Sequence, residues 1–278
     1  MVIVFGSVNL DLIARVPAIP GPGETLLGTS FATAPGGKGA NQALAARLSG
    51  ARVAMVGAVG RDAFADAALA NLSASGVDLA GVVRVAAPTG IALINVDAKG
   101  ENAITVVAGA NGHARASQVG DDALVPGNTL LMQLEVPLAE VASLAQRGKS
   151  RGARVVLNGA PAAALPAELL RDVDFLVVNE HEAAVCLGSH SGVDVVLTLG
   201  ARGATMCWNG IRHSEAPADV VVVDTTGAGD ALCGAFAAAL DRGAAPRAAL
   251  REGVHAGALA CTYRGAQRAV AASGDGGR

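Results

Sequence analysis

Short apolar runs alternate with alanine-rich stretches along the chain, a pattern typical of buried strands joined by helices. The apolar runs predict strands over residues 2–5, 52–59, 129–134, 154–157, 175–178, 195–199 and 220–223. The stretches between them predict helices over residues 40–48, 62–75, 138–146, 180–187 and 231–242. This order predicts a single α/β domain with three layers, doubly wound around a mostly parallel sheet.

Two segments, 12–34 and 89–108, break the alternation because neither holds a helix between its strand-like runs. Turns at Gly21-Pro22-Gly23 and Lys99-Gly100 divide them. We expect them to pair as a small antiparallel sheet, a lid that covers a site at one edge of the domain and whose outer face can pack on a second copy. Residues 206–212 predict a hairpin turning at Asn209-Gly210, and residues 273–278 a loose tail.

Composition narrows the class of protein. Hydrophobic residues make up 51% of the 278 residues and aromatic residues only 3%, so the core must be built from Ala, Val and Leu. The formal net charge of -3 and the mixed charge pattern argue against a nucleic-acid or membrane partner. No apolar run approaches the roughly 20 residues of a membrane span, and no basic leader precedes the first strand, so we expect a cytoplasmic protein. Four separated cysteines predict buried free thiols without a zinc site or disulfides.

The richest chemistry follows the valine run at 220–223, where the chain reads DTTGAGD from Asp224 to Asp230. A glycine-rich turn at a helix N-terminus leaves main-chain N–H groups free to bind an anion such as phosphate. An acid in that turn can take a proton from a hydroxyl while the amides hold a transferring phosphoryl group. The alternative is that Asp230 only caps the helix.

A second glycine loop, Pro35-Gly36-Gly37-Lys38-Gly39, stands at the head of the helix predicted at 40–48. It is not a Walker A loop, because no Ser or Thr follows the lysine. The ammonium of Lys38 suits sugar hydroxyls or a phosphate. The alternative is a solvated lysine in an ordinary turn.

Polar residues also follow several predicted strands, at the edge where ligands of α/β sheets bind. Asn9 and Asp11 are two residues apart, so in an extended chain they face one side and can bracket adjacent hydroxyls; an Asx-turn is the alternative. Glu135 ends the strand predicted at 129–134.

Asn179 and Glu182 follow the strand predicted at 175–178 and lie three residues apart at a helix start. Their oxygens could hold the waters of a Mg²⁺ ion, or they could form a capping box. In the segment 198–203, two glycines would let a nucleotide lie against the backbone.

Seven motifs in order, GSVNLD, GGKGANQ, MQLE, NGAPA, VNEHE, TLGARG and DTTGAGD, resemble the ribokinase group of sugar kinases, the PfkB family. The resemblance runs from residue 2 to about 267. It implies a ribokinase-like fold, and ATP-dependent phosphorylation of D-ribose at its 5-hydroxyl. It also implies a homodimer formed through the two lids.

The resemblance assigns roles to individual residues. Asp230 would be the base, with the amides of Gly227, Ala228 and Gly229 as the anion hole. The implied sugar ligands are Asn9, Asp11, Gly37, Lys38, Gly39, Asn41, Glu135 and Asp230. The implied ATP contacts are Asn179, Thr198, Gly200, Arg202, Gly203 and Gly229. Glu182 would organise Mg²⁺ through water, and an activating K⁺ would be held by Asp224, Thr226, Ala260, Tyr263 and Gly265.

Three departures from the family pattern mark places where contacts can differ. The segment 183–194 is short, as if a helix were missing, although the crossover still allows a parallel connection. Val254, with His255 beside it, stands where many relatives place a polar residue against adenine, and Ala269 replaces a small hydroxyl residue near the K⁺ position. Two other functions stay open: a kinase for another sugar or a nucleoside, and a non-catalytic sugar or nucleotide sensor.

Overall fold

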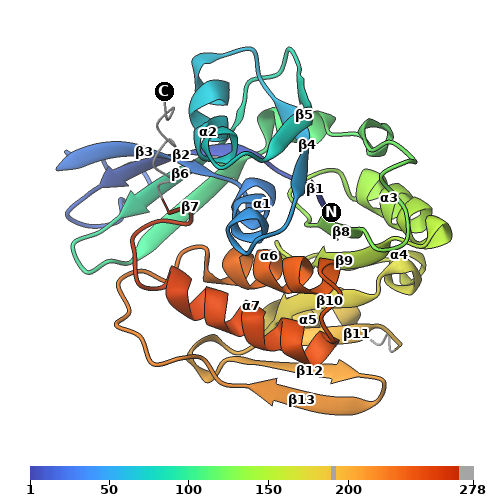
Figure 1. The fold of residues 1–278 in the computed structure, drawn as a ribbon. Coiled ribbons are helices and arrows are strands. Elements are labelled where there is room, and N and C mark those ends of the chain that lie inside the picture. Colours follow the sequence, from blue (N-terminus) through green and yellow to red (C-terminus); the bar gives the residue numbers. More distant parts are fainter. Residues whose placement is uncertain (189–191, 269–278) are drawn as a thin grey trace, which may run out of the picture.

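A computed structural model describes residues 1–188 and 192–268 of the chain, so Ala269 and the predicted tail lie outside the described residues. The described chain forms the predicted three-layer fold, with helices on both faces of a nine-stranded sheet (Figure 1). Neighbouring strands are parallel except at β11–β12 and β12–β13. In spatial order the strands are β13 (Ile211–Glu215), β12 (Ala204–Trp208), β11 (Asp194–Thr198), β10 (Phe175–Asn179), β9 (Arg154–Asn158), β8 (Thr129–Met132), β1 (Val2–Phe5), β4 (Val53–Val59) and β5 (Asp78–Arg84).

The two faces of the sheet carry separate cores because side chains alternate along each strand. In β1, Val2 and Val4 belong to one buried cluster, and Ile3 and Phe5 to the other. The first cluster lies under α1 (Lys38–Leu48), α2 (Ala63–Ala74), α6 (Ala228–Asp241) and α7 (Pro246–Ala260). The second lies under α3 (Leu138–Arg151), α4 (Ala167–Asp172) and α5 (Glu180–Leu187). Short 3₁₀ turns lie at η1 (Gly109–His113), η2 (Ala116–Gln118) and η3 (Gly200–Arg202).

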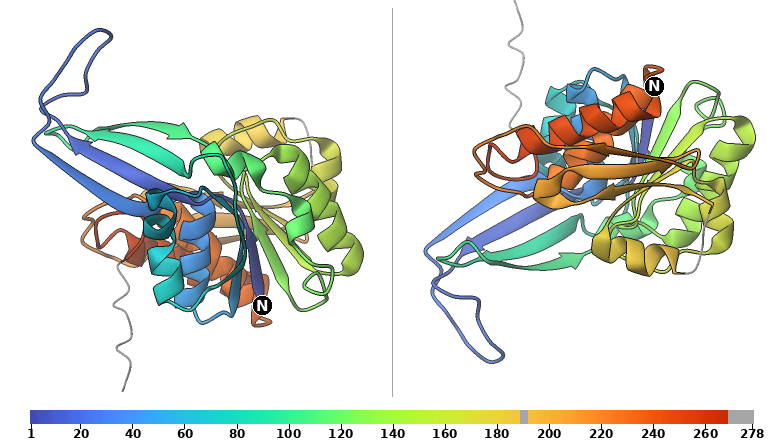
Figure 2. Two further views of the ribbon diagram at one scale, coloured as in Figure 1. Left: turned by 90° about the horizontal axis from the view of Figure 1, so that it is seen from above. Right: turned by 90° about the horizontal axis from the view of Figure 1, so that it is seen from below.

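The predicted lid is present as a second sheet that extends away from the main body (Figure 2). Its four strands, in spatial order, are β3 (Ser30–Gly36), β2 (Asn9–Arg15), β6 (Gly90–Val96) and β7 (Asn102–Val107). Each predicted segment contributes an antiparallel pair. The two pairs join through β2 and β6, which are parallel, so the sheet is antiparallel only at its outer pairs.

The base of the lid is fastened to the head of α2. Asp62 caps that helix by accepting the N–H of Ala65. The same carboxylate accepts the hydroxyl of Thr89 at 2.7 Å and the N–H of Thr89 at 2.8 Å, one residue before β6. Thr89 Oγ1 in turn accepts the N–H of Gly60 at 2.9 Å. Asp62 therefore connects the α2 cap to the start of the lid.

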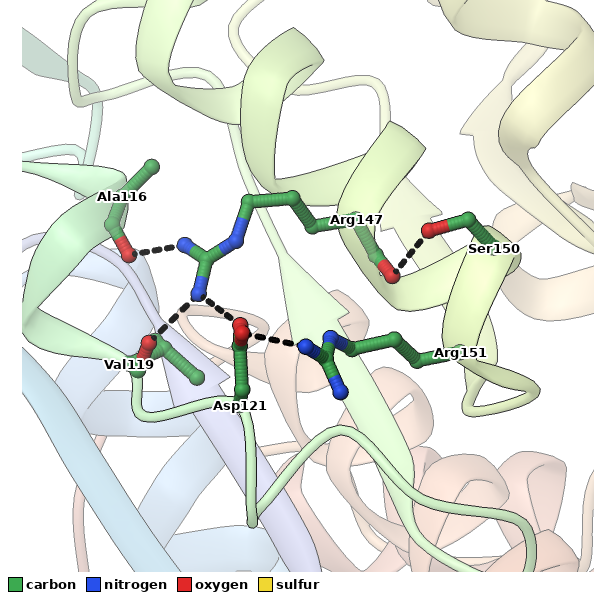
Figure 3. Close-up of polar contacts among 6 residues, drawn as sticks. All are labelled: Ala116, Val119, Asp121, Arg147, Ser150 and Arg151. Atoms are coloured by element: carbon green, nitrogen blue, oxygen red, sulfur yellow. Dashed lines mark hydrogen bonds and ion pairs between the residues drawn. The ribbon is translucent and has the colours of Figure 1, made fainter.

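A partly exposed arginine network holds the loop between the lid and β8 against α3. Arg147 donates to the carbonyl oxygens of Ala116 and Val119, both at 2.9 Å, and pairs with Asp121 at 2.6 Å (Figure 3). Arg151 binds the other oxygen of Asp121. Because three acceptors converge on one guanidinium, α3 fixes the path of this loop.

One predicted strand is wrong: residues 220–223 form no strand in the structure. Val221 is 82% exposed and Val222 is 61% exposed. The segment follows the edge strand β13 and passes outside the sheet, and Val223 N–H donates to Cys261 O, the one backbone hydrogen bond it makes with the described residues. Four β-branched residues favour extended backbone, but in the described structure this segment does not pair with the edge strand β13 or with any other strand.

Other differences are smaller. The predicted hairpin at 206–212 is β12–β13, with Asn209 and Gly210 both at positive φ. Strand β5 and helices α4 and α7 were not predicted. Cys186 and Cys233 are buried as expected, whereas Cys207 is exposed, and all four thiols are free. Across the described residues, no helix is long and apolar enough to cross a membrane, and no cluster of acidic, His and Cys side chains could hold a metal.

Candidate active site

Close packing of α1 on α6 places Asp230 in the middle of the protein. At Gly234, one turn beyond Asp230, an added Cβ would lie 2.5 Å from Gln42 O and 2.6 Å from Ala45 Cβ. The missing side chain therefore lets the two helices approach until α1 presents polar groups directly to Asp230. Only 8% of Asp230 is exposed.

Two amides from adjacent residues of α1 hold the Asp230 carboxylate. Asn41 Nδ2 donates to Asp230 Oδ2 and Gln42 Nε2 donates to Asp230 Oδ1, both at 2.9 Å. The cap of α6 is Gly227, which has φ of 79° and no side-chain cap. Asp230 is therefore not the N-cap of this helix, and the capping alternative for it is wrong.

The polar network continues into the sheet through residues that the sequence did not identify. Gln42 Nε2 also donates to Asn158 Oδ1 at 3.0 Å, and Asn158 Nδ2 donates to Val177 O. Gln133 Nε2 donates to Gln42 Oε1 at 2.8 Å. Gln42, Gln133 and Asn158 lie inside quoted motifs, but a buried amide has no local sequence pattern that distinguishes it from an exposed one.

The amides of the glycine turn are partly available for an anion. Ala228 N–H donates to Thr225 O at 3.2 Å, so that amide already has an acceptor within the turn. Within the described part of the chain, the N–H groups of Gly227 and Gly229 have no acceptor. The space beside Gly229 is open, because an added Cβ would meet nothing within 4 Å. The turn thus supplies two unpaired donors at the head of α6.

Lys38 lies at the head of α1 and faces the Asp230 carboxylate. Attraction to Asp230 is the main cause that raises the pKa of Lys38; burial lowers it, and Glu135 and Glu182 raise it further. The ammonium is therefore charged at neutral pH and sits among carboxylates. This excludes the alternative of a lysine solvated in an ordinary turn.

Glu135 connects the loop that follows β1 to the glycine loop that precedes α1. Its Oε2 accepts the hydroxyl of Ser7 at 2.5 Å and the N–H of Lys38 at 3.1 Å. Ser7 Oγ also accepts the N–H of Gly39 at 3.3 Å. At Gly37 an added Cβ would lie 2.7 Å from Asn9 N, so the loop can pass here only without a side chain.

Asn9 and Asp11 begin β2, where the lid leaves the main domain. Asn9 Oδ1 accepts Asn111 Nδ2 at 2.7 Å, and Asn111 Oδ1 accepts the N–H of Val8. Asn9 and Asp11 both lie in the extended strand β2, so neither forms an Asx-turn here. Burial, aided by repulsion from Glu135 and Asp230, raises the pKa of Asp11 to about 6. Because burial and neighbouring carboxylates disfavour the charged form of Asp11, hydrogen-bond donors such as sugar hydroxyls would stabilise it.

A cleft of about 180 Å³ connects Asp230 to the nucleotide-side residues. Its lining includes Lys38, Asn179, Glu182, Thr198, Gly227, Gly229, Asp230 and Cys233. The sequence motifs at the ends of β10 and β11 therefore meet the head of α6, as the rule for parallel sheets predicts. Burial raises the pKa of Cys233 well above its ordinary value, so this thiol is protonated.

The Asn179–Glu182 pair forms a capping box. Asn179 Oδ1 accepts Glu182 N–H, and Glu182 Oε2 accepts Asn179 N–H, both at 2.8 Å. Arg202 is not in the cleft lining; it pairs with Glu180 at 2.8 Å on an exposed surface. Gly203 has φ of 83°, and an added Cβ would lie 2.1 Å from Glu215 O, so its glycine is required by the β12–β13 hairpin.

The loop after α7 meets the start of the glycine turn. Asp224 Oδ1 accepts the N–H and hydroxyl of Thr226, and Asp224 Oδ2 accepts Gly265 N–H at 2.9 Å. Burial opposes ionisation, but these hydrogen bonds outweigh it and hold the pKa of Asp224 below its ordinary value. Asp224, Thr226 and Gly265, three of the five residues predicted around K⁺, are therefore joined by hydrogen bonds. The other two are close in sequence to Gly265: Ala260 ends α7, and Tyr263 lies in the loop that follows it.

Comparison with known proteins agrees with this arrangement. Residues 1–272 match the family described as pfkB family carbohydrate kinase. A ribokinase from Bacillus subtilis is 38% identical over 274 residues, which cover 95% of this chain and 94% of the relative. A deoxyribokinase from Salmonella typhi is 33% identical, with 95% and 93% covered. The structure of Arabidopsis thaliana ribokinase complexed with ribose and ATP superimposes with a TM-score of 0.85 at 31% identity, covering 95% of this chain and 93% of that one.

The fold and the site define a kinase that phosphorylates a sugar hydroxyl. The chain belongs to the pfkB family of carbohydrate kinases.

Proposed function

We infer that this protein transfers the γ-phosphoryl group of ATP to the 5-hydroxyl of D-ribose, giving ribose 5-phosphate and ADP. The observation that carries the inference is the buried Asp230, fixed by Asn41 and Gln42 in a cleft shared with Lys38 and the unpaired amides of the glycine turn. The ribokinase relatives support ribose as the substrate.

Each part of this arrangement has a task in phosphoryl transfer. Asp230 accepts the hydroxyl proton as the sugar oxygen forms its bond to phosphorus and the bond to ADP breaks. The amides of Gly227 and Gly229 donate to the oxygens of the migrating group, and Lys38 adds positive charge beside them. Asn9, Asp11 and Glu135 orient the sugar, with Gly37, Gly39 and Asn41 shaping the loop around it. Ala228 can join the anion hole only by giving up its bond to Thr225 O.

Kinases use ATP together with a divalent metal ion such as Mg²⁺, and the residues of this chain fit a site that holds the ion through water. Glu182 lines the cleft but uses Oε2 in the capping box, which leaves Oε1 to accept from water. Since the described residues offer no cluster of three acidic, His or Cys ligands, water and phosphate oxygens would complete the coordination. Bound Mg²⁺ would neutralise charge on the phosphates. Asn179, Thr198, Gly200, Arg202 and Gly203 would border the nucleotide.

A K⁺ ion would fit the loop around Asp224. The carbonyl oxygens of Ala260 and Tyr263 accept no hydrogen bond from the described residues, so they are available as ligands beside Asp224, Thr226 and Gly265. Ala269, noted above as a departure from the family pattern near this site, lies outside the described residues. The carbonyl oxygens would supply the coordination that K⁺ prefers, a shell of neutral oxygens.

A homodimer through the lid would cover apolar surface. Asp11, Ala92 and Val106 are register partners and share the sugar-facing side of the lid. Farther from the base, the same side carries Ile94 and Ile104, and Ile104 is 53% exposed, so we propose this side for the contact in place of the outer face expected from the sequence. A second lid packed on this side would bury these residues, and sedimentation equilibrium would measure the assembly.

The deoxyribokinase relative favours a second candidate substrate, 2-deoxy-D-ribose. A site that binds the 2-hydroxyl through Asn9 or Asp11 would be left with an unpaired buried group by the deoxy sugar. We therefore expect kcat/KM to favour ribose by about 100-fold or more.

Release of ADP, measured with a panel of pentoses, hexoses and nucleosides, tests the proposal. We expect ribose to be the best acceptor and Asp230→Asn to lower kcat by about 1000-fold or more, with ribose binding retained in calorimetry. Asp122→Asn, at an exposed carboxylate, is the matched control. Binding of ribose and ATP without ADP release in the wild type would identify a sensor, and near-normal turnover of Asp230→Asn would remove the assigned base.

A further inference from the structure

Gln267, in the segment that follows α7, contacts the catalytic network from outside the cleft. Its Nε2 donates to Asn41 Oδ1 at 3.0 Å. Asn41 in turn donates from Nδ2 to Asp230 Oδ2 at 2.9 Å. A single amide therefore separates Gln267 from the catalytic carboxylate.

The direction of these hydrogen bonds matters because the two ends of an asparagine amide have nearly the same shape but opposite roles. If the Asn41 amide were reversed, its oxygen would face the Asp230 carboxylate and repel it. The donor from Gln267 can bond only to the oxygen of Asn41, so it selects the orientation in which the Asn41 NH₂ faces Asp230.

The other amide on Asp230 is oriented in the same way. Gln42 donates to Asp230 Oδ1, and Gln133 Nε2 donates to Gln42 Oε1 at 2.8 Å. Each amide that holds the carboxylate is thus itself held by a glutamine donor. Gln133 is fully buried, whereas Gln267 is half-buried and can be changed with less effect on the core.

The orientation of Gln267 is fixed as well. Asn71 Nδ2, on α2, donates to Gln267 Oε1 at 3.1 Å, so the NH₂ of Gln267 faces Asn41. The preceding residues also contact the site: Gly265 N–H donates to Asp224, and an added Cβ on Gly227 would lie 2.6 Å from Ala266 Cα. The segment 265–267 therefore packs against the glycine turn and the α1 amide together.

We propose that Gln267 is a positioning residue for phosphoryl transfer, which orients the Asn41 amide so that Asp230 keeps the geometry needed to accept the hydroxyl proton. The proposal rests on the proposed function, and it assigns Gln267 no contact with substrate.

Two substitutions of similar length separate donation from packing. Gln267→Met removes both polar ends, and Gln267→Glu keeps the acceptor for Asn71 but cannot donate to Asn41. A carboxylate there would attract the Asn41 NH₂ and favour the reversed amide. We expect kcat to fall about 10-fold in Gln267→Met and about 100-fold in Gln267→Glu, with KM for ATP within about 2-fold of wild type.

The controls are Gln146→Glu, which makes the same change at an exposed position of α3, and Asn71→Ala, which frees the other end of Gln267. Gln146→Glu should match wild type, and Asn71→Ala should lower kcat about 3-fold. Thermal midpoints of the Gln267 variants should stay within a few degrees of wild type.

A kcat for Gln267→Glu equal to or above that of Gln267→Met would overturn the proposal, since a packing role or a tie to Asn71 would favour Glu. Wild-type kcat in both variants would overturn it equally. If the wild type phosphorylates a sugar other than ribose, the ribose assignment fails while the ranking of Gln267 variants is measured with that sugar. If no sugar is phosphorylated, both proposals fall.

Discussion

The sugar side and the nucleotide side of the cleft are built in opposite ways. Around Asp230 and Glu135, side chains from α1, α6 and the strand ends are buried and bound to one another. On the nucleotide side, the contacts are the capping box of Asn179 and Glu182 and the surface ion pair of Arg202 with Glu180. We infer that the sugar side is preorganised before substrate arrives, whereas the nucleotide side is completed by ATP.

The largest effect on the ordered sugar side is expected from a substitution that separates α1 from α6. In Gly234→Ala, the new methyl group would overlap Gln42 O and Ala45 Cβ, so we expect stability to fall by about 2–3 kcal/mol. Because Asn41 and Gln42 would move away from Asp230, kcat should fall at least 10-fold even where the protein is still folded. Chemical denaturation and steady-state kinetics measure both effects.

Gly112→Ala is the control for that experiment, because an added Cβ there meets nothing within 4 Å. It should leave stability within about 0.5 kcal/mol of wild type. A Gly234→Ala protein with unchanged kcat would show that the closeness of the two helices is not what orders the site.

A smaller effect is expected at Asp11, where the carboxylate that we expect to bind ribose lowers the stability of the folded protein. The pKa of Asp11 is about 6 in the folded protein, whereas the unfolded chain releases this proton near the ordinary aspartate pKa of 3.8. Between these values the folded state binds more protons, so this residue lowers stability as pH rises through the window. Asp11→Asn should therefore raise the free energy of unfolding at pH 7.5 by about 1–3 kcal/mol, while kcat/KM for ribose falls about 10- to 100-fold.

Urea unfolding of wild type and Asp11→Asn at pH 4 and pH 7.5 checks the stability effect. The difference between the two proteins should shrink toward pH 4. A variant that is less stable than wild type at pH 7.5 would contradict the strained carboxylate.

The smallest effect is expected on the nucleotide side. Arg202 and Glu180 are both well exposed, so Arg202→Ala should change stability by less than about 0.5 kcal/mol. If Arg202 borders ATP, KM for ATP should rise about 3-fold, with kcat unchanged. A drop in kcat as large as that of Gly234→Ala would mean that the nucleotide side is as preorganised as the sugar side.

The fold could be predicted from the sequence where the hydrophobic periodicity agrees with the positions of the turn residues. The buried strands β1, β8, β9 and β10 followed their apolar runs, and the two helix-free segments formed the lid. The run at 220–223 has the same composition as a core strand, but in the described structure it lies outside the sheet and pairs with no strand. Composition carries no information on that point.

The site was predictable where a motif ends a strand, because the topology of a parallel sheet brings strand ends together. Asn179 and Thr198 were found in this way, whereas Lys38 and Asp230 were found from glycine turns at the heads of helices. Gln133 and Gln267 could not be found, since their importance lies in contacts with residues far away in sequence. The pair Asn179 and Glu182 shows a further limit, because the spacing that suits an ion also suits a helix cap.

The fastening of Thr89 to Asp62 restricts how the small sheet can move. Swinging the whole sheet as a rigid plate would break the three hydrogen bonds of Thr89, at a cost of about 3 kcal/mol. Twisting of the strands beyond that anchor leaves all three intact. We therefore expect the small sheet to bend over the sugar with its base held in place, so that displacement grows toward the loop that joins β2 to β3.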